Sequence, residues 1–175
     1  MNRLVFLIVF TMCCAPDFSG QPTKCPKLPE TYTWKSADDY KKDYDLVKKT
    51  LKWLCNTPLG IDVQQRSIAN AFVLEWLAGS PQIQVEIETK KLTFYSQYPD
   101  LMFSFIHGVA LHKMEKPTVQ DELSLYSAGY ATVASLASQS EELSKSGELK
   151  PLLKALKKNR IKEFTQLALG HKDKK

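Results

Sequence analysis

In "PDLMFSFIHGVALHKM", residues 99–114, apolar side chains would occupy almost every face of a helix. A helix that is apolar all round is normally buried by its neighbours on every side. We therefore expect this segment to be the central helix of the core.

Two predicted helices precede this segment. The first begins at Ser36, and Asp39 completes a capping-box pattern. Its apolar residues recur at helical spacing: Tyr40, Tyr44, Val47, Leu51 and Leu54. The second begins at Asp62, with Gln65 in the reciprocal capping position, and ends at Gly79. Its expected inner stripe is Ile68, Ala71, Phe72, Leu74 and Trp76.

Two more predicted helices follow the central one. Residues 118–143 open with Thr118 and Asp121 in capping positions. A row of small residues should let a neighbouring helix approach closely: Ser127, Ala131, Ala134, Ser135 and Ser138. Residues 146–169 form the last helix, with Pro151 in the first turn, where proline is tolerated. Its expected inner stripe is Leu149, Leu152, Leu156, Phe164 and Leu167.

The segment near residues 82–95 has a different period. Ile83, Val85 and Ile87 alternate with polar residues, and Leu92 and Phe94 continue the alternation after a polar loop. This period is typical of a strand. A small hairpin is the first interpretation, and an extended cover over the bundle or a short helix are the alternatives.

Together these segments predict an all-α fold, an up-and-down bundle of about five helices with a short extended or hairpin segment near 82–95. The helical domain is expected to cover residues 36–169. Residues 21–35, rich in proline and polar side chains, are expected to be an extended lead-in, and residues 170–175 a disordered basic tail.

The first twenty residues, "MNRLVFLIVFTMCCAPDFSG", resemble an export signal. Arg3 is followed by an apolar run of about a dozen residues, which is too short for the ~20 that a membrane-spanning helix needs. We expect residues 1–20 to be a signal peptide and the protein to be periplasmic or secreted. Cleavage after residue 15 or after residue 20 are both open, and Cys13 or Cys14 is an alternative site of lipid attachment.

Two cysteines, Cys25 and Cys55, remain beyond the signal. In an oxidising compartment such a pair predicts a disulfide. Closing a loop of about thirty residues would stabilise the fold by roughly 3–4 kcal/mol. The alternative is two separate thiols, with Cys55 packed in the core.

A short motif gives the chain a resemblance to uncharacterised exported helical proteins of Bacteroidota. In these, a helix ending in Trp-Leu-x-Gly-x-Pro precedes an apolar helix that opens with Asp-Leu. The matching residues here are Trp76, Leu77, Gly79, Pro81, Asp100 and Leu101. The resemblance implies a helical fold and an exported location, and no assigned activity comes with it.

No catalytic signature stands out in the sequence. The closest approach to a metal site is His107, His112 and Glu115, but a spacing of five turns the second ring by about 140° from the first. No nucleophile elbow is present, and the glycines occur singly, so no phosphate-binding loop is formed. We expect a non-enzymatic protein without a cofactor, and a small metal-dependent enzyme using these three residues is the alternative.

Charge is the most uneven feature. Residues 145–175 hold ten Lys or Arg against three acids, a net +7 in a chain of net charge +5. The lysines of the last predicted helix lie opposite its leucines: Lys150, Lys154, Lys157, Lys158 and Lys162. A basic amphipathic helix can contact an anionic membrane or an acidic partner, although a merely solvated face is the alternative. Nucleic acid is not expected, because no aromatic residues interleave with these lysines.

These observations predict an exported, non-catalytic binding or structural protein of the bacterial envelope. Its partner would be an acidic envelope protein or an anionic membrane surface, contacted through the five lysines. A further alternative is a carrier of apolar ligands. Its pocket residues, which would equally make an ordinary core, are Phe72, Trp76, Met102, Phe103, Phe105, Tyr126 and Tyr130.

Overall fold

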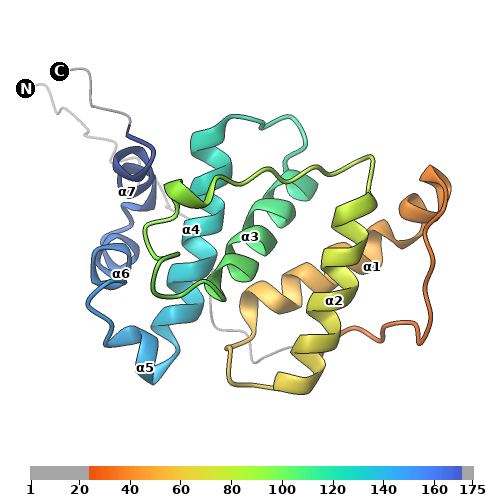
Figure 1. Ribbon diagram of the computed structural model, residues 1–175, viewed down its shortest axis with the longest axis horizontal. Helices are drawn as coiled ribbons and strands as arrows, with labels where there is room; N and C mark the ends of the chain where they lie inside the picture. Colours follow the sequence, from red (N-terminus) through yellow and green to blue (C-terminus); the bar gives the residue numbers. More distant parts are fainter. Residues whose placement is uncertain (1–23, 171–175) are drawn as a thin grey trace, which may run out of the picture.

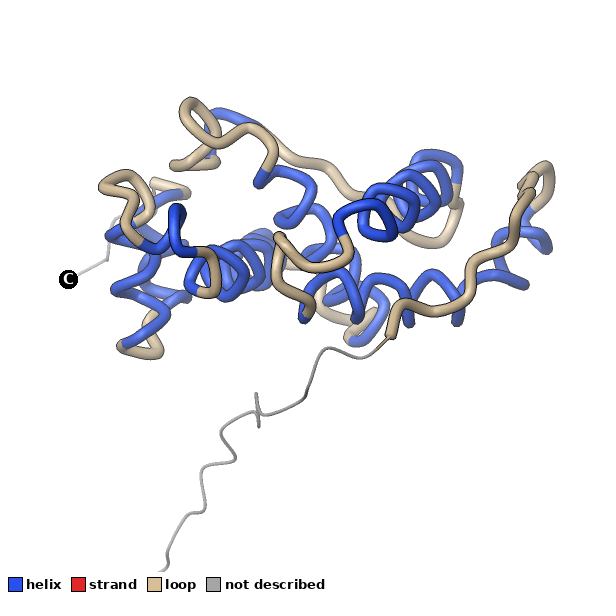
Figure 2. The backbone as a smooth tube through the Cα atoms, turned by 90° about the horizontal axis from the view of Figure 1, so that it is seen from below, coloured by secondary structure: helices blue, strands red, loops and turns tan. Residues whose placement is uncertain are grey.

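The computed structural model describes residues 24–170. The predicted signal peptide, with its cleavage and lipid-attachment sites, and residues 171–175 of the predicted basic tail lie outside this part. Within it every regular element is a helix, as Figure 2 shows. The four long helices are α1 (Ala37–Asn56), α2 (Val63–Gly79), α3 (Leu101–Glu115) and α4 (Glu122–Ser138). Three short helices follow, α5 (Glu141–Ser144), α6 (Lys150–Lys157) and α7 (Ile161–Ala168), and one 3₁₀ turn, η1 (Thr89–Lys91), precedes α3. The all-α prediction is confirmed.

The helices form two groups on either side of α3 (Figure 1). Helices α1 and α2 pack on each other, and α1 also packs on α3. On the other side α3 lies against α4, which in turn carries α6 and α7. Eight residues of α3 are buried, at positions spread around the whole helix. The prediction that this segment is the central helix is therefore confirmed.

Helices α3 and α4 approach each other closely at two glycines. A Cβ atom at Gly108 would lie 2.4 Å from the Thr132 Oγ1 and 2.7 Å from the Ala128 carbonyl oxygen. A Cβ atom at Gly129 would lie 2.7 Å from the Phe105 ring. Only part of the predicted row of small residues takes part in this close approach. Most of the row lies beside the α3–α4 interface, where it lines a groove.

Replacing Gly108 with alanine is expected to lower the free energy of unfolding by about 1–3 kcal/mol. The new methyl group meets a backbone carbonyl, so the two helices must move apart, and such overpacking outweighs the ~1 kcal/mol gain in helix propensity. Urea denaturation measures the change. Gly147→Ala is the control, because nothing lies within 4 Å of the added atom there. Equal stability of the two variants would contradict this account of the interface.

The predicted hairpin near residues 82–95 is not formed, and the described residues contain no strand. The segment is instead an extended cover, one of the alternatives, with η1 in its course. Its alternation holds, since Ile83, Leu92 and Phe94 are buried. Hydrogen bonds with tyrosine side chains of α4 take the place of those that a partner strand would make. The Tyr130 hydroxyl donates to the Lys91 carbonyl (2.6 Å), and the Tyr126 hydroxyl accepts from the backbone N–H of Glu88 (3.0 Å).

The predicted last helix is broken into α6 and α7. Asn159 has φ 53°, in the left-handed region that asparagine tolerates better than most residues. The Arg160 N–H bonds to the Ala155 carbonyl and the Asn159 N–H to the Leu156 carbonyl, which is the Schellman pattern of a helix C-terminus. The break turns the chain, so Leu167 is 71% exposed instead of lying on the inner stripe.

The lead-in is packed on the α1–α2 pair from residue 24 onward. The Tyr32 and Trp34 rings stack with centroids 4.7 Å apart, and Tyr32 meets the edge of Phe72 at 5.1 Å. The Trp34 indole N–H donates to Asp43 (2.8 Å). These contacts complete the core of this half of the molecule.

Candidate functional site

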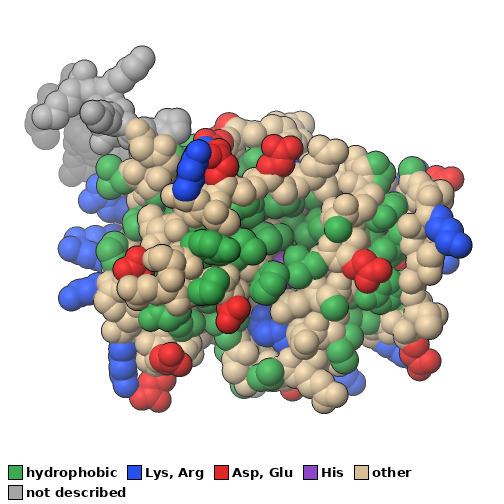
Figure 3. Space-filling view, viewed as in Figure 1, with side chains coloured by type: hydrophobic (Ala, Val, Ile, Leu, Met, Phe, Trp, Pro, Cys, Tyr) green, Lys and Arg blue, Asp and Glu red, His purple; other side chains and the backbone are tan. Residues whose placement is uncertain are grey.

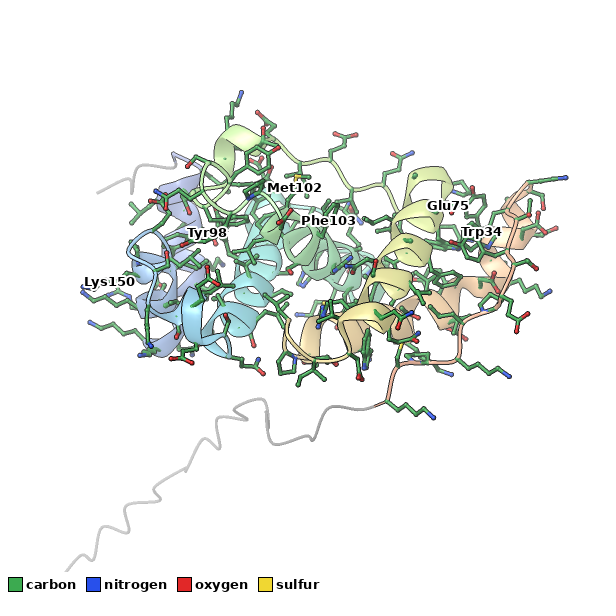
Figure 4. All side chains as sticks on the ribbon, turned by 60° about the horizontal axis from the view of Figure 1, so that its bottom comes forward. Trp34, Glu75, Tyr98, Met102, Phe103 and Lys150 are labelled. Carbon is green, nitrogen blue, oxygen red and sulfur yellow. The ribbon has the colours of Figure 1, made fainter. Side chains whose placement is uncertain are left out.

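The lysine surface consists of five exposed side chains on α6, at its C-cap and on α7: Lys150, Lys154, Lys157, Lys158 and Lys162. Figure 3 shows Lys and Arg side chains gathered at this end of the molecule. Helix α6 presents its lysines because its opposite face is buried against α4 through Leu152, Leu153 and Ala155. In Figure 4, Lys150 points away from the bundle at this end of the molecule. The structure thus brings together the lysines named from the sequence, although Lys162 belongs to a separate helix.

Neighbouring acids do not neutralise this surface. Helix α6 contains no Asp or Glu, whereas the lysines of α1 alternate with four aspartates. Among the ion pairs of residues 24–170, none includes any of the five lysines. Glu163 on α7 pairs with Arg160 instead, at 3.4 Å. Lys162 lies close enough to Asp121 to interact with its carboxylate, so the uncompensated positive charge is concentrated on the other four lysines.

A cleft of about 470 Å³ lies at the edge of this surface, between α5 and α6. Lys145, Lys150, Lys154 and Lys157 line it together with the hydroxyl-bearing side chain of Ser144. We call it the lysine cleft. Lys145 was not among the residues named from the sequence, since it lies before the predicted last helix. The Ser144 hydroxyl donates to the Glu141 carbonyl and Lys145 pairs with the Glu141 carboxylate. The ammonium groups of the other three lysines remain as donors suited to anionic oxygens.

A larger groove of about 1020 Å³ adjoins the lysine cleft along α4. Its floor is the small-residue face of α4, and its walls are the end of α1 and α3 on one side and α6–α7 on the other. We call it the α4 groove. Ser138 and Leu156 line both hollows, so the groove and the cleft are direct neighbours. The sequence identifies these small residues, but it predicts that a neighbouring helix packs on them and not that they line a groove.

The three residues of the predicted metal site do not assemble one. His107 is 2% exposed in the core, where burial and the Arg66 guanidinium lower its pKa to about 3. His112 lies at the α4 groove, and Glu115 pairs with Lys52 at 2.9 Å. Within residues 24–170, no three His, Cys, Asp or Glu side chains form a group that could hold a metal ion.

The predicted disulfide is wrong, because Cys25 and Cys55 are both free thiols. Cys25 lies against Gln65 of α2, with 3.6 Å between its Sγ and the Gln65 Nε2. Cys55 faces α4 near Thr132, and burial raises its pKa to about 12. The spacing along the chain permits the loop, but the helical position of Cys55 directs its sulfur away from the lead-in. The alternative of two separate thiols, with Cys55 in the core, is confirmed.

The aromatic residues considered for a ligand pocket divide between two packed clusters. Phe72 and Trp76 belong to the α1–α2–α3 cluster, and Phe105, Tyr126 and Tyr130 to the α3–α4 cluster. Met102 and Phe103 lie at the outer face of α3, and Phe103 is 39% exposed (Figure 4). These seven side chains therefore do not enclose a common pocket, and the first five form the core.

No helix in the described part of the chain has both the length and the apolar character that crossing a bilayer requires. In comparisons with known proteins, no family model, curated protein or solved structure gives a significant match to this chain. The features that bear on its function are thus the uncompensated lysine surface and the two hollows beside it.

Proposed function

We propose that the chain is an exported, non-catalytic binding protein of the bacterial envelope that docks on anionic lipid through the lysine surface. The observation that carries the proposal is the cluster of five exposed lysines on α6 and α7 with no acidic neighbour in α6. Each lysine near an anionic membrane contributes about 1 kcal/mol, and the attraction falls off within about 10 Å at 0.1 M salt.

Replacing the five lysines of the surface by glutamine removes about 5 kcal/mol of attraction and is expected to weaken binding to phosphatidylglycerol-containing vesicles by on the order of 1,000-fold or more at low salt. Vesicle flotation measures the binding, and 0.5 M salt should release the unmodified protein. The matched control replaces five other exposed lysines by glutamine: Lys24, Lys27, Lys41, Lys42 and Lys49. It carries the same net charge and should still bind.

Two results would overturn the proposal. Equal loss in both five-fold variants would mean that net charge alone governs binding. Retention of the unmodified protein in the envelope fraction without any affinity for anionic vesicles would assign the lysine surface to an acidic protein instead of lipid.

A further inference from the structure

The α4 groove and the lysine cleft together have the form of a site for an amphiphile. We infer that they bind a single-chain anionic lipid, with the acyl chain along the α4 groove and the head group against the lysine cleft. This inference rests on the proposed function in using part of the same lysine surface, and it goes further by assigning a ligand class and a binding pose.

The floor of the groove suits an acyl chain in length and in shape. It runs along α4 from Ser124 to Ser138, which at 1.5 Å per residue is about 21 Å. One leaflet of a bilayer is about 15 Å thick in its hydrocarbon part, so one chain of a membrane lipid fits this length. The side chains of the floor are Ser, Ala and Thr, which leave the path open: Ser124, Ser127, Ala128, Ala131, Thr132, Ser135 and Ser138.

The walls of the groove combine apolar side chains with polar ones, the latter being Asn56, His112, Asn159 and Lys162. Leu111 and Cys55 stand on one side, and Leu156 and Ile161 on the other. Leu156 and Ile161 are only half-buried, and no described segment covers them. Covering them with a hydrocarbon chain would remove apolar surface from water at about 25 cal/mol per Å².

Charge decides the orientation and the sign of the ligand. The groove adjoins the lysine cleft at Ser138 and Leu156, and four lysines line the cleft. No carboxylate among the described residues lines either hollow. Lys145 pairs with Glu141 at 2.8 Å, so within residues 24–170 Lys150, Lys154 and Lys157 are the cleft's unpaired lysines. Only one lysine of the described chain, Lys162, lines the groove. The larger share of the positive charge therefore places an anionic head group at the cleft, with its chain along α4.

A docked partner helix is the competing occupant of the groove. A helix is about 10–12 Å across with its side chains, so a length of about 21 Å would fill roughly twice the volume of the groove. Only part of such a helix could be seated. An acyl chain, by contrast, can enter completely, which is why we favour the lipid.

Lysophosphatidylglycerol, kept below its micelle concentration, tests the inference by calorimetric titration of the lipid-free full chain. We expect one molecule to bind per chain. Lysophosphatidylcholine, with the same acyl chain and no net charge, should bind at least about tenfold more weakly, and glycerol 3-phosphate, the head without the chain, should show no binding.

A groove-filling variant separates this site from the lysine surface. Ala131→Leu places a larger side chain on the floor and should weaken lysophosphatidylglycerol binding at least about tenfold, while vesicle binding stays unchanged. Ala71→Leu, at an exposed position of α2, is the matched control and should bind the lipid normally. Thermal unfolding curves of both variants test whether each one remains folded.

The outcomes distinguish this inference from the proposed function. Unchanged lipid binding by Ala131→Leu, or equal binding of the anionic and zwitterionic lipids, overturns the inference. Vesicle binding that depends on the five lysines, without binding of the free lysolipid, overturns the inference and leaves the proposed function standing. Binding of a glutamate-rich helical peptide that Ala131→Leu abolishes, with no lysolipid bound, would assign the groove to a protein helix.

Discussion

Replacing Arg66 with methionine is expected to lower the free energy of unfolding by about 2–4 kcal/mol. Arg66 begins the inner face of α2, yet it is only 7% exposed. Its guanidinium reaches across to the C-terminus of α1. There Nη1 donates to the Leu54 carbonyl (3.2 Å), and Nη2 donates to the carbonyls of Thr57 and Pro58.

The expected loss of stability is large because two of these carbonyls would lose their hydrogen-bond donor. The last carbonyls of a helix have no partner within the helix, and they form the negative end of its dipole. The Arg66 guanidinium bonds to one of them, the Leu54 carbonyl, and to the carbonyl of the C-cap residue Thr57. It also lies over the Trp53 ring, 5.6 Å from its centroid. Methionine would fill the space but leave the carbonyls of Leu54 and Thr57 unpaired, whereas the Pro58 carbonyl would keep its bond from the Ile61 N–H.

Urea denaturation at pH 7 measures this effect. Arg160→Met is the control, because that guanidinium is exposed and its single contact, with Glu163, should contribute less than about 0.5 kcal/mol. Arg66→Lys should fall between, since one ammonium group cannot reach both ends of the carbonyl set. A loss no greater than that of Arg160→Met would show that the guanidinium does not hold the junction.

Arg66 also shows why one part of the fold could not be predicted from the sequence. The inner face of α2 is Arg66, Ala69, Phe72, Val73 and Trp76, at regular helical spacing. The predicted stripe contains Ile68, which is 50% exposed, and omits Arg66, because arginine side chains usually lie on the protein surface. A charged residue that bonds to carbonyls of another helix belongs inside, but the sequence does not show where those carbonyls lie.

Local signals were otherwise sufficient for most of the helices. The Ser36 capping box forms as predicted, and Asp121 caps α4 by accepting from the Ser124 N–H. Asp62 does not cap α2 with its side chain, because its backbone has φ 47°. These residues differ in backbone conformation at the cap, which the residue type alone does not determine.

The candidate site, like the fold, could be predicted from the sequence only in part. The lysine surface follows from composition and helical spacing, which are properties of the sequence. The α4 groove depends on which row of α4 meets α3. Because α3 crosses at Gly129 instead of at Ala131, the row that contains Ala131 remains uncovered. Tertiary packing, and not the residue pattern of α4 alone, determines which row α3 covers.

His107 is expected to make the protein acid-labile. Its pKa is about 3 in the folded protein, because burial disfavours the imidazolium and the Arg66 charge adds to this. The ordinary value in the unfolded chain is about 6.5. Between these two values the unfolded state binds the extra proton and the folded state does not, so stability falls as the pH falls. The loss approaches about 1.4 kcal/mol per pH unit, or roughly 4–5 kcal/mol by pH 3.

Comparison with His107→Gln isolates this contribution from that of the carboxylates, which also lose stability in acid. Glutamine has no proton to gain, so the free energy of unfolding of this variant should fall less steeply than that of the unmodified protein between pH 6.5 and 4. Urea denaturation at half-unit steps measures both slopes. His112→Gln is the matched comparison, since His112 is only half-buried and its pKa is lowered mainly by that partial burial.

The two large predictions are coupled, because Arg66 is one cause of the low pKa of His107. Arg66→Met should therefore raise the pKa of His107 and make the acid slope somewhat shallower, although burial, the larger cause, remains. Parallel slopes for the unmodified protein and His107→Gln would mean that His107 takes up its proton in the folded state as easily as in the unfolded chain. That result would contradict a sealed interface between α3 and the α1–α2 pair, and with it the central position of α3.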